Sequence, residues 1–151
     1  MDLSVLNTKE KSETGVWTQV KYMGTKLPVE ILIYGEDCDK VQKYNAEKAK
    51  KLGTIKAAIA SGEMTADDID IKELDTSIED AVARTAGMRT TDGTPLTIAG
   101  VEVGNDVESY RLVYTSIPEI RKFVLREAGD STNFLPNGKK SLKELSNGTS
   151  S

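Results

Sequence analysis

The sequence predicts an α+β fold: a helix-dominated single domain with a small N-terminal β-hairpin. Two observations support this. Residues 16–22 and 29–34 alternate between apolar and polar side chains, as strands do, and several later stretches repeat apolar residues in steps of three and four. A chain of 151 residues with 38% hydrophobic content can build one modest core. We expect a single domain over residues 15–145, between a flexible arm (1–14) and a disordered tail (146–151).

The hairpin is expected over residues 15–35. On the first strand, alternation places Val16, Thr18, Val20 and Tyr22 on one face. On the second strand, Val29, Ile31 and Ile33 share a face opposite Glu30, Leu32 and Tyr34. Residues 23–28 would connect the strands as a longer loop. Residues 88–90 and 96–98 flank an Asp-Gly turn and could form a second short hairpin. An isolated hairpin is marginal in water, so a helix or another chain must cover one face.

The first helix is expected over residues 37–60. Asp37 is placed to accept the first free backbone N–H groups as the N-cap. A thin apolar stripe follows, and several lysines come before Gly53, which suits a helix end. The composition of residues 54–60 allows the helix to continue to Ala60.

Further helices are expected over residues 69–86 and, as a pair, over 105–128. The first has the best helical periodicity in the chain, and Gly87 stops it. Within the pair, Pro118 suits the first turn of the second helix, because its missing N–H would be unpaired there in any case. The later part of the chain is therefore predicted to be helical.

The composition argues against several classes of function. A net charge of −4 disfavours nonspecific nucleic-acid binding, which needs a basic face. Histidine is absent, which removes the commonest general base and transition-metal ligand. The single cysteine, Cys38, allows neither an intrachain disulfide nor a cysteine zinc site. With no secretory signal and no apolar run of roughly 20 residues, we expect a soluble protein of a reducing cytosol that does not bind membranes.

One cluster of reactive side chains precedes the first predicted helix. The carboxylates of Glu36, Asp37 and Asp39 could hold a divalent cation, but carboxylates are also typical of a solvated helix start, which is the preferred interpretation. Cys38 at a helix N-terminus could be nucleophilic, yet the chain has no histidine to act as its base. We therefore expect neither an enzyme nor a cofactor site.

Residues 69–145 carry a resemblance to a known family. After the central helix come short motifs in a fixed order: Ala86-Gly87-Met88, Asp92-Gly93-Thr94-Pro95-Leu96, Tyr110-Arg111-Leu112-Val113-Tyr114, Pro118-Glu119-Ile120 and Asn133-Phe134-Leu135. This pattern resembles the tail assembly chaperones of long-tailed bacteriophages. Residues 29–40 are similar to the strand-then-helix beginning of that family.

The resemblance implies a non-catalytic protein of the host bacterial cytoplasm that binds the tape measure protein, a long helical and aggregation-prone chain. It would help to recruit tail tube subunits around that partner. Self-association stays open. Exposed apolar stripes on short helices could cover a helical seam of the partner, while the charged remainder keeps the complex soluble.

Seven apolar residues of the C-terminal region form the hypothetical partner-binding surface: Tyr110, Tyr114, Ile120, Phe123, Val124, Phe134 and Leu135. The alternative is that most of them are core, and that is the expectation for any one taken singly. A rival function is a structural virion protein, a small tail or connector component whose N-terminal arm and hairpin contact neighbouring subunits.

Overall fold

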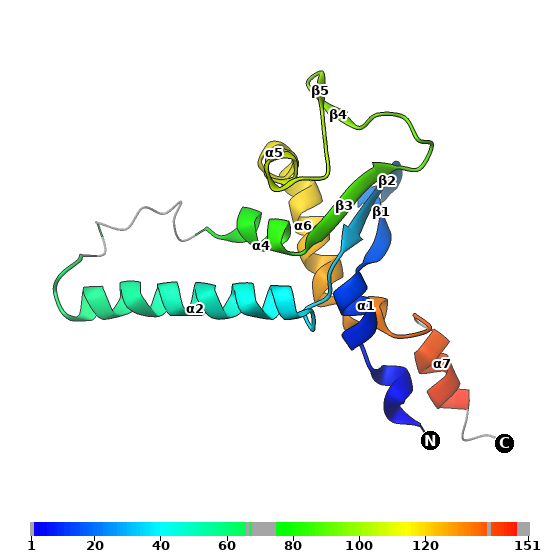
Figure 1. Ribbon diagram of the computed structural model, residues 1–151, viewed down its shortest axis with the longest axis horizontal. Helices are drawn as coiled ribbons and strands as arrows, with labels where there is room; N and C mark the ends of the chain where they lie inside the picture. Colours follow the sequence, from blue (N-terminus) through cyan, green and yellow to red (C-terminus); the bar gives the residue numbers. More distant parts are fainter. Residues whose placement is uncertain (1, 66, 68–74, 139, 148–151) are drawn as a thin grey trace.

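The computed structural model describes residues 2–65, 67, 75–138 and 140–147 (Figure 1). It confirms the α+β fold with a small N-terminal hairpin. Three strands form an antiparallel sheet in the order β1-β2-β3: β1 (Val16–Tyr22), β2 (Thr25–Ile33) and β3 (Thr85–Thr90). The predicted alternation is confirmed for the buried residues, since Val20, Ile31 and Ile33 all lie in the core.

The turn of the hairpin differs from the expected longer loop. Met23 and Gly24 alone connect the strands, both with positive φ (50° and 82°), as a tight two-residue turn requires. Pro28 therefore lies inside β2. The register of the two strands shifts between Gln19 and Lys21, beside this proline. Because proline has no N–H to donate to the ladder, a bulge is the way in which the strand accommodates it.

The expected helix over residues 69–86 is wrong in its last part. Helix α4 covers only Ser77–Ala83, and Thr85–Thr90 is the strand β3, paired with β2. Tertiary pairing with an existing strand overrides the local helical pattern here. Residues 69–74 of that predicted helix lie outside the described residues.

The expected second hairpin is wrong as well. Residues 88–90 pair with β2, so they are not available to residues 96–98. Instead β4 (Thr97–Ile98) pairs with β5 (Val101–Glu102) across the turn Ala99-Gly100.

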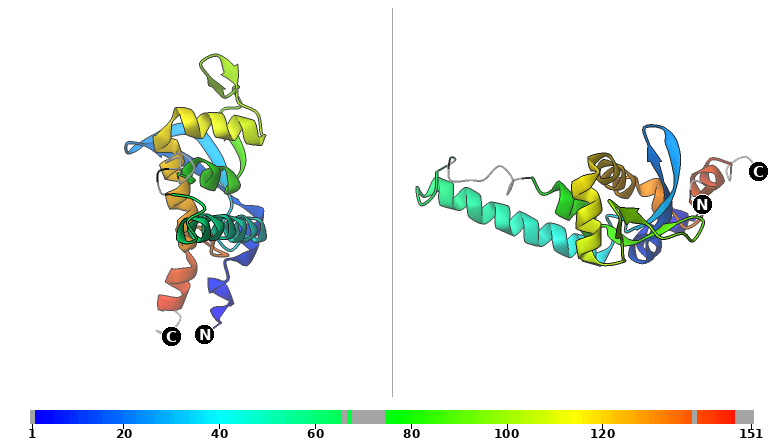
Figure 2. Two further views of the ribbon diagram at one scale, coloured as in Figure 1. Left: turned by 90° about the vertical axis from the view of Figure 1, so that its left-hand side faces the viewer. Right: turned by 90° about the horizontal axis from the view of Figure 1, so that it is seen from above.

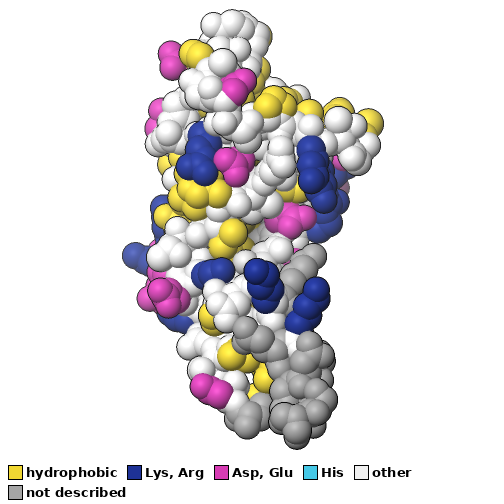
Figure 3. All heavy atoms as spheres, turned by 90° about the vertical axis from the view of Figure 1, so that its right-hand side faces the viewer, with side chains coloured by type: hydrophobic (Ala, Val, Ile, Leu, Met, Phe, Trp, Pro, Cys, Tyr) yellow, Lys and Arg dark blue, Asp and Glu magenta, His cyan; other side chains and the backbone are white. Residues whose placement is uncertain are grey.

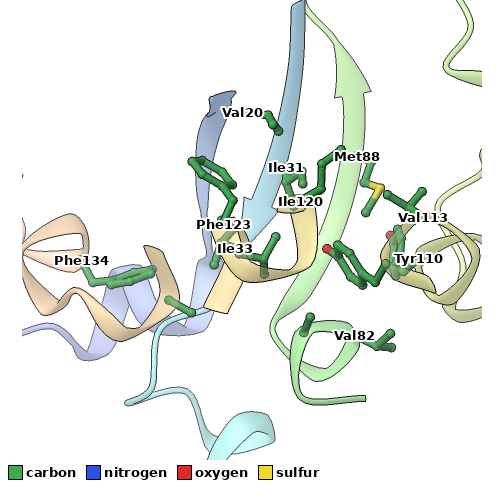
Figure 4. Close-up of a cluster of buried hydrophobic side chains, with 14 residues drawn as sticks. Val20, Ile31, Ile33, Val82, Met88, Tyr110, Val113, Ile120, Phe123 and Phe134 are labelled. Carbon is green, nitrogen blue, oxygen red and sulfur yellow. The ribbon is translucent and has the colours of Figure 1, made fainter. Parts of the chain in front are cut away.

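Two helices cover the inner face of the sheet, in the stretch where the sequence predicts a helical pair. They are α5 (Val107–Ser116) and α6 (Pro118–Gly129), and α6 contacts both β1 and β2. Asp106 caps α5 by accepting a hydrogen bond from the backbone N–H of Ser109, and Pro118 opens α6. The core lies between these helices, α4 and the sheet (Figure 4).

The N-terminal residues differ from the expected loose arm. They form a 3-10 turn, η1 (Leu3–Leu6), and helix α1 (Lys9–Thr14), whose Ser12 is fully buried. Ser12 packs directly against Gly35, where an added Cβ would stand 2.2 Å from the serine Oγ. This close approach requires glycine at position 35.

The C-terminal part continues from α6 into η3 (Ser131–Phe134) and then α7 (Lys140–Asn147), which contacts η1. Both chain ends therefore lie at the same end of the molecule (Figures 1 and 2). The expected disordered tail falls, from residue 148 onward, outside the described residues.

Helix α2 (Asp39–Ala60) projects sideways from this body (Figures 1 and 2). It is one continuous helix of 22 residues, and Gly53 lies within it rather than at its end. No helix in the described part of the chain is long and apolar enough to cross a membrane.

Candidate partner-binding surfaces

The seven predicted partner-binding residues are all buried. Figure 4 shows four of them, Tyr110, Ile120, Phe123 and Phe134, within the core cluster. Each is at most 9% exposed: Tyr110, Tyr114, Ile120, Phe123, Val124, Phe134 and Leu135. They come from α5, α6 and the segment after it, and their shared property is packing rather than accessibility. In this conformation they cannot form a binding surface, because a partner would first have to open the core. The alternative stated from the sequence, that they are core, is what the structure shows.

Tyr114 illustrates how firmly this region is packed. Its ring is fully buried, and its hydroxyl shares a hydrogen bond with Thr85 at the start of β3. The Thr85 hydroxyl in turn donates to the Ala81 carbonyl (2.7 Å), so one chain of contacts joins α5, β3 and α4. Burial raises the pKa of Tyr114 above its ordinary value, because the anion would lose its hydration. The phenol is therefore a neutral structural group.

A second buried polar group anchors α2. The guanidinium of Arg84, only 7% exposed, forms a bidentate pair with Glu36 (2.6 and 2.9 Å). It also donates to the Asp80 carbonyl and to the side chain of Asn45 on α2. Because the residue lies between α4 and β3, it fixes the root of α2 against the sheet.

The acidic residues before α2 are held by separate partners. Asp37 accepts from Thr8, Asp39 pairs with Lys9, and Glu36 pairs with Arg84 as described above. Over the described ranges, no group of three or more His, Cys, Asp and Glu side chains is arranged to hold a metal ion.

The cap of α2 comes from an unexpected residue. The backbone N–H of Asp39 donates to Glu13 of α1, whereas the sequence assigns the cap to Asp37. This bond, together with Lys9, lowers the pKa of the Glu13 carboxyl. Cys38 is buried, and its thiol donates to the Glu13 carboxylate (Sγ to Oε2, 3.8 Å). The N-terminal helix thus holds the start of α2.

An apolar groove opens beside the core, on the side of the β4–β5 loop. Its volume is about 170 Å³, and its walls come from β2, β3, the loop before β4, α5 and α6. Leu27, Leu96 and Ile98 form its half-buried rim, and Ile31, Met88 and Ile120 form its buried floor. With no charged side chain in its wall, it suits apolar side chains.

Sequence reasoning did not find this groove. Its rim comes from residues distant in the chain, and their convergence depends on the β2–β3 pairing that the sequence did not reveal. The signal that could have found it is the apolar content of Leu96, Ile98 and Val103 in a loop rich in glycine, since surface loops are usually polar.

Comparison of the chain with protein-family models, with curated proteins and with solved structures gave no match.

Proposed function

We propose that this chain is a tail assembly chaperone of a long-tailed bacteriophage. It binds the tape measure protein in the host cytoplasm and helps to recruit tail tube subunits, without catalysis. Two things support the proposal: the resemblance of residues 69–145 to that family, and the apolar groove between the sheet and the β4–β5 loop. The groove is the observation that carries it, because it is a concave apolar site without charged groups in its wall.

In the proposed contact, apolar side chains of a partner helix bind in the groove. A long helical partner exposes such side chains at intervals of three and four residues, so a short groove can take one or two at a time. The acidic balance of the chain, −4 overall, keeps the complex soluble while the partner's apolar seam is covered.

The test is co-expression with the longest predicted coiled-coil protein encoded nearby. The proposal expects that this partner moves into the soluble fraction and co-purifies with the chain. If it stays insoluble while the chain purifies alone as a discrete species, the proposal is overturned.

A matched pair of variants assigns the contact to the groove. Ile98→Asp places a charge on the rim, whereas Val101→Asp places the same charge on the other strand of the same small hairpin, where Val101 is 56% exposed. We expect Ile98→Asp to abolish co-purification and Val101→Asp to retain it. Both variants should melt within a few degrees of the parent.

The second candidate is a structural virion protein. It is favoured by β1, an edge strand of the sheet, because within the described residues only one side of β1 pairs with another strand. On this side of the molecule, Lys and Arg side chains lie among hydrophobic ones (Figure 3). Such an edge could accept a strand from a neighbouring subunit. Detection of the chain in purified particles, in fixed ratio to other components, would favour this candidate, since a chaperone is absent from them.

A further inference from the structure

Helix α2 carries the opposite charge to the protein it belongs to. It holds six lysines against two carboxylates, a net charge of +4, on a chain whose net charge is −4. At about 1.5 Å per residue, its 22 residues span roughly 33 Å. A basic helix of this length projecting from an acidic body is a separate electrostatic surface.

The contacts that α2 makes with other described elements lie in its first three turns. Val41 is buried, and Tyr44 donates to Asp80 of α4 (2.7 Å). Lys48 also pairs with Asp80 (3.2 Å). Beyond Lys48, the side-chain hydrogen bonds recorded for the described residues of α2 stay within the helix and its C-terminal cap. Among the described residues, the distal half is therefore held through its root.

An apolar stripe continues along the distal half on the same face as Val41. Leu52, Ile55 and Ile59 follow one another in steps of three and four, so they stand in one row. Leu52 and Ile55 are half-buried, and Ile59 is 37% exposed. The row has the spacing of a seam that receives another helix.

Two lysines flank this row. Lys51 precedes Leu52 and Lys56 follows Ile55, which places one ammonium group on each side of the stripe. Both are exposed, and neither has an ion pair within the described parts of the chain. Charges in these flanking positions select the partner helix in coiled-coil contacts.

We propose that the distal half of α2 docks an acidic amphipathic helix of another protein. Its apolar side chains would cover Leu52, Ile55 and Ile59, and its carboxylates would pair with Lys51 and Lys56. A second copy of α2 is the wrong occupant, because two helices of net +4 would bring lysines together along the seam. The inference rests on the proposed function only for where this partner is to be sought; the surface is argued from α2 alone.

The experiment uses the full chain and a designed probe. The probe is a peptide of about three heptads (roughly 21 residues) with leucine at the core positions and glutamate at the flanking ones; a matched peptide carries lysine there. We expect the acidic peptide to bind at least roughly tenfold more tightly than the basic one, with affinity falling as salt is raised.

Charge reversal sharpens the test. The double variant Lys51→Glu, Lys56→Glu should no longer bind the acidic peptide and should bind the basic one. Lys50→Glu is the matched control, since it makes the same kind of change on the opposite face of the helix and should keep the parent's preference. Equal binding of both peptides, or no exchange of preference, overturns the proposal.

Two further outcomes also overturn it. If Leu52→Ala with Ile55→Ala lowers the melting temperature by more than a few degrees, the stripe is already packed in the free chain. If the parent is a dimer in solution and this variant is a monomer, a second copy covers the stripe.

Failure here is distinguishable from failure of the proposed function. Loss of co-purification in Ile98→Asp, but not in the α2 variants, would leave the groove proposal standing and remove this one. If α2 binds the acidic peptide while the coiled-coil protein does not co-purify, this proposal stands and the proposed function is overturned.

Discussion

Helices α6 and α2 show two ways in which this chain uses an amphipathic helix. In α6, 12 residues long, Ile120, Phe123, Val124 and Ala128 are all buried against the sheet and its neighbours. In α2, 22 residues long, only Val41 is buried. The shorter helix is part of the core, whereas the longer one is held at its root and carries its apolar stripe away from the body (Figure 1).

The difference teaches where a partner can bind. Large apolar side chains that are buried in the core of the chain are poor candidates for a docking surface, because a partner cannot reach them. A thin apolar stripe with lysines on both sides contributes little to a core, but its spacing and charge can still select a partner.

The largest expected effect separates the two regions directly. Phe134→Ala empties a site that is 2% exposed and should reduce the free energy of unfolding by about 3–5 kcal/mol. Ile55→Ala on the distal half of α2 should change it by less than about 0.5 kcal/mol. Chemical denaturation of both variants measures the contrast, and equal losses would mean that α2 is packed as tightly as the body.

The hairpin and the buried residues Val20, Ile31 and Ile33 follow from alternation, and the fold class follows from alternation together with the helical periodicity of the later stretches. The strand β3 does not, because Thr85–Thr90 becomes a strand only where β2 offers it a partner. The seven residues predicted to bind a partner are buried, which the sequence could not decide in advance. Periodicity identifies apolar side chains that must be covered, but it does not say whether the same chain or another covers them.

A smaller effect concerns the root of α2. Glu36→Gln leaves the buried guanidinium of Arg84 without its carboxylate, which should cost about 1.5–3 kcal/mol. The matched control Glu47→Gln, on the exposed part of α2, should cost less than about 0.5 kcal/mol. Urea denaturation of the two variants checks this, and indistinguishable midpoints would contradict the anchoring role of Arg84.

The cap of α2 predicts a pH dependence. The pKa of Glu13 is lowered by the Asp39 N–H and by Lys9, so the ionised carboxylate stabilises the fold at pH values above the ordinary pKa of a glutamate. That stabilisation is lost as the pH falls through the folded-state pKa. We therefore expect the parent to have a higher urea midpoint than Glu13→Gln at pH 7, and the gap to narrow in acid. A gap independent of pH would rule out this role for the charge.

The smallest effect on global stability is expected at Gly53. Its surroundings are open, with no atom within 4 Å of an added Cβ, and its backbone is helical. Gly53→Ala should therefore favour the local helix by up to about 1 kcal/mol. Because the distal half of α2 is held through its root among the described residues, circular dichroism should show more helix while the melting temperature of the body stays the same. A rise in that temperature would show that the two regions unfold together.

Hydrogen exchange along α2, measured in the free chain and in its complex with the acidic peptide, distinguishes a docking helix from a packed one. In the free chain, we expect fast exchange of the amides of residues 49–60 and strong protection of the body. In the complex, we expect residues 49–60 to become protected. If these amides are already as protected as those of α6 in the free chain, or stay unprotected in the complex, α2 is not a docking arm.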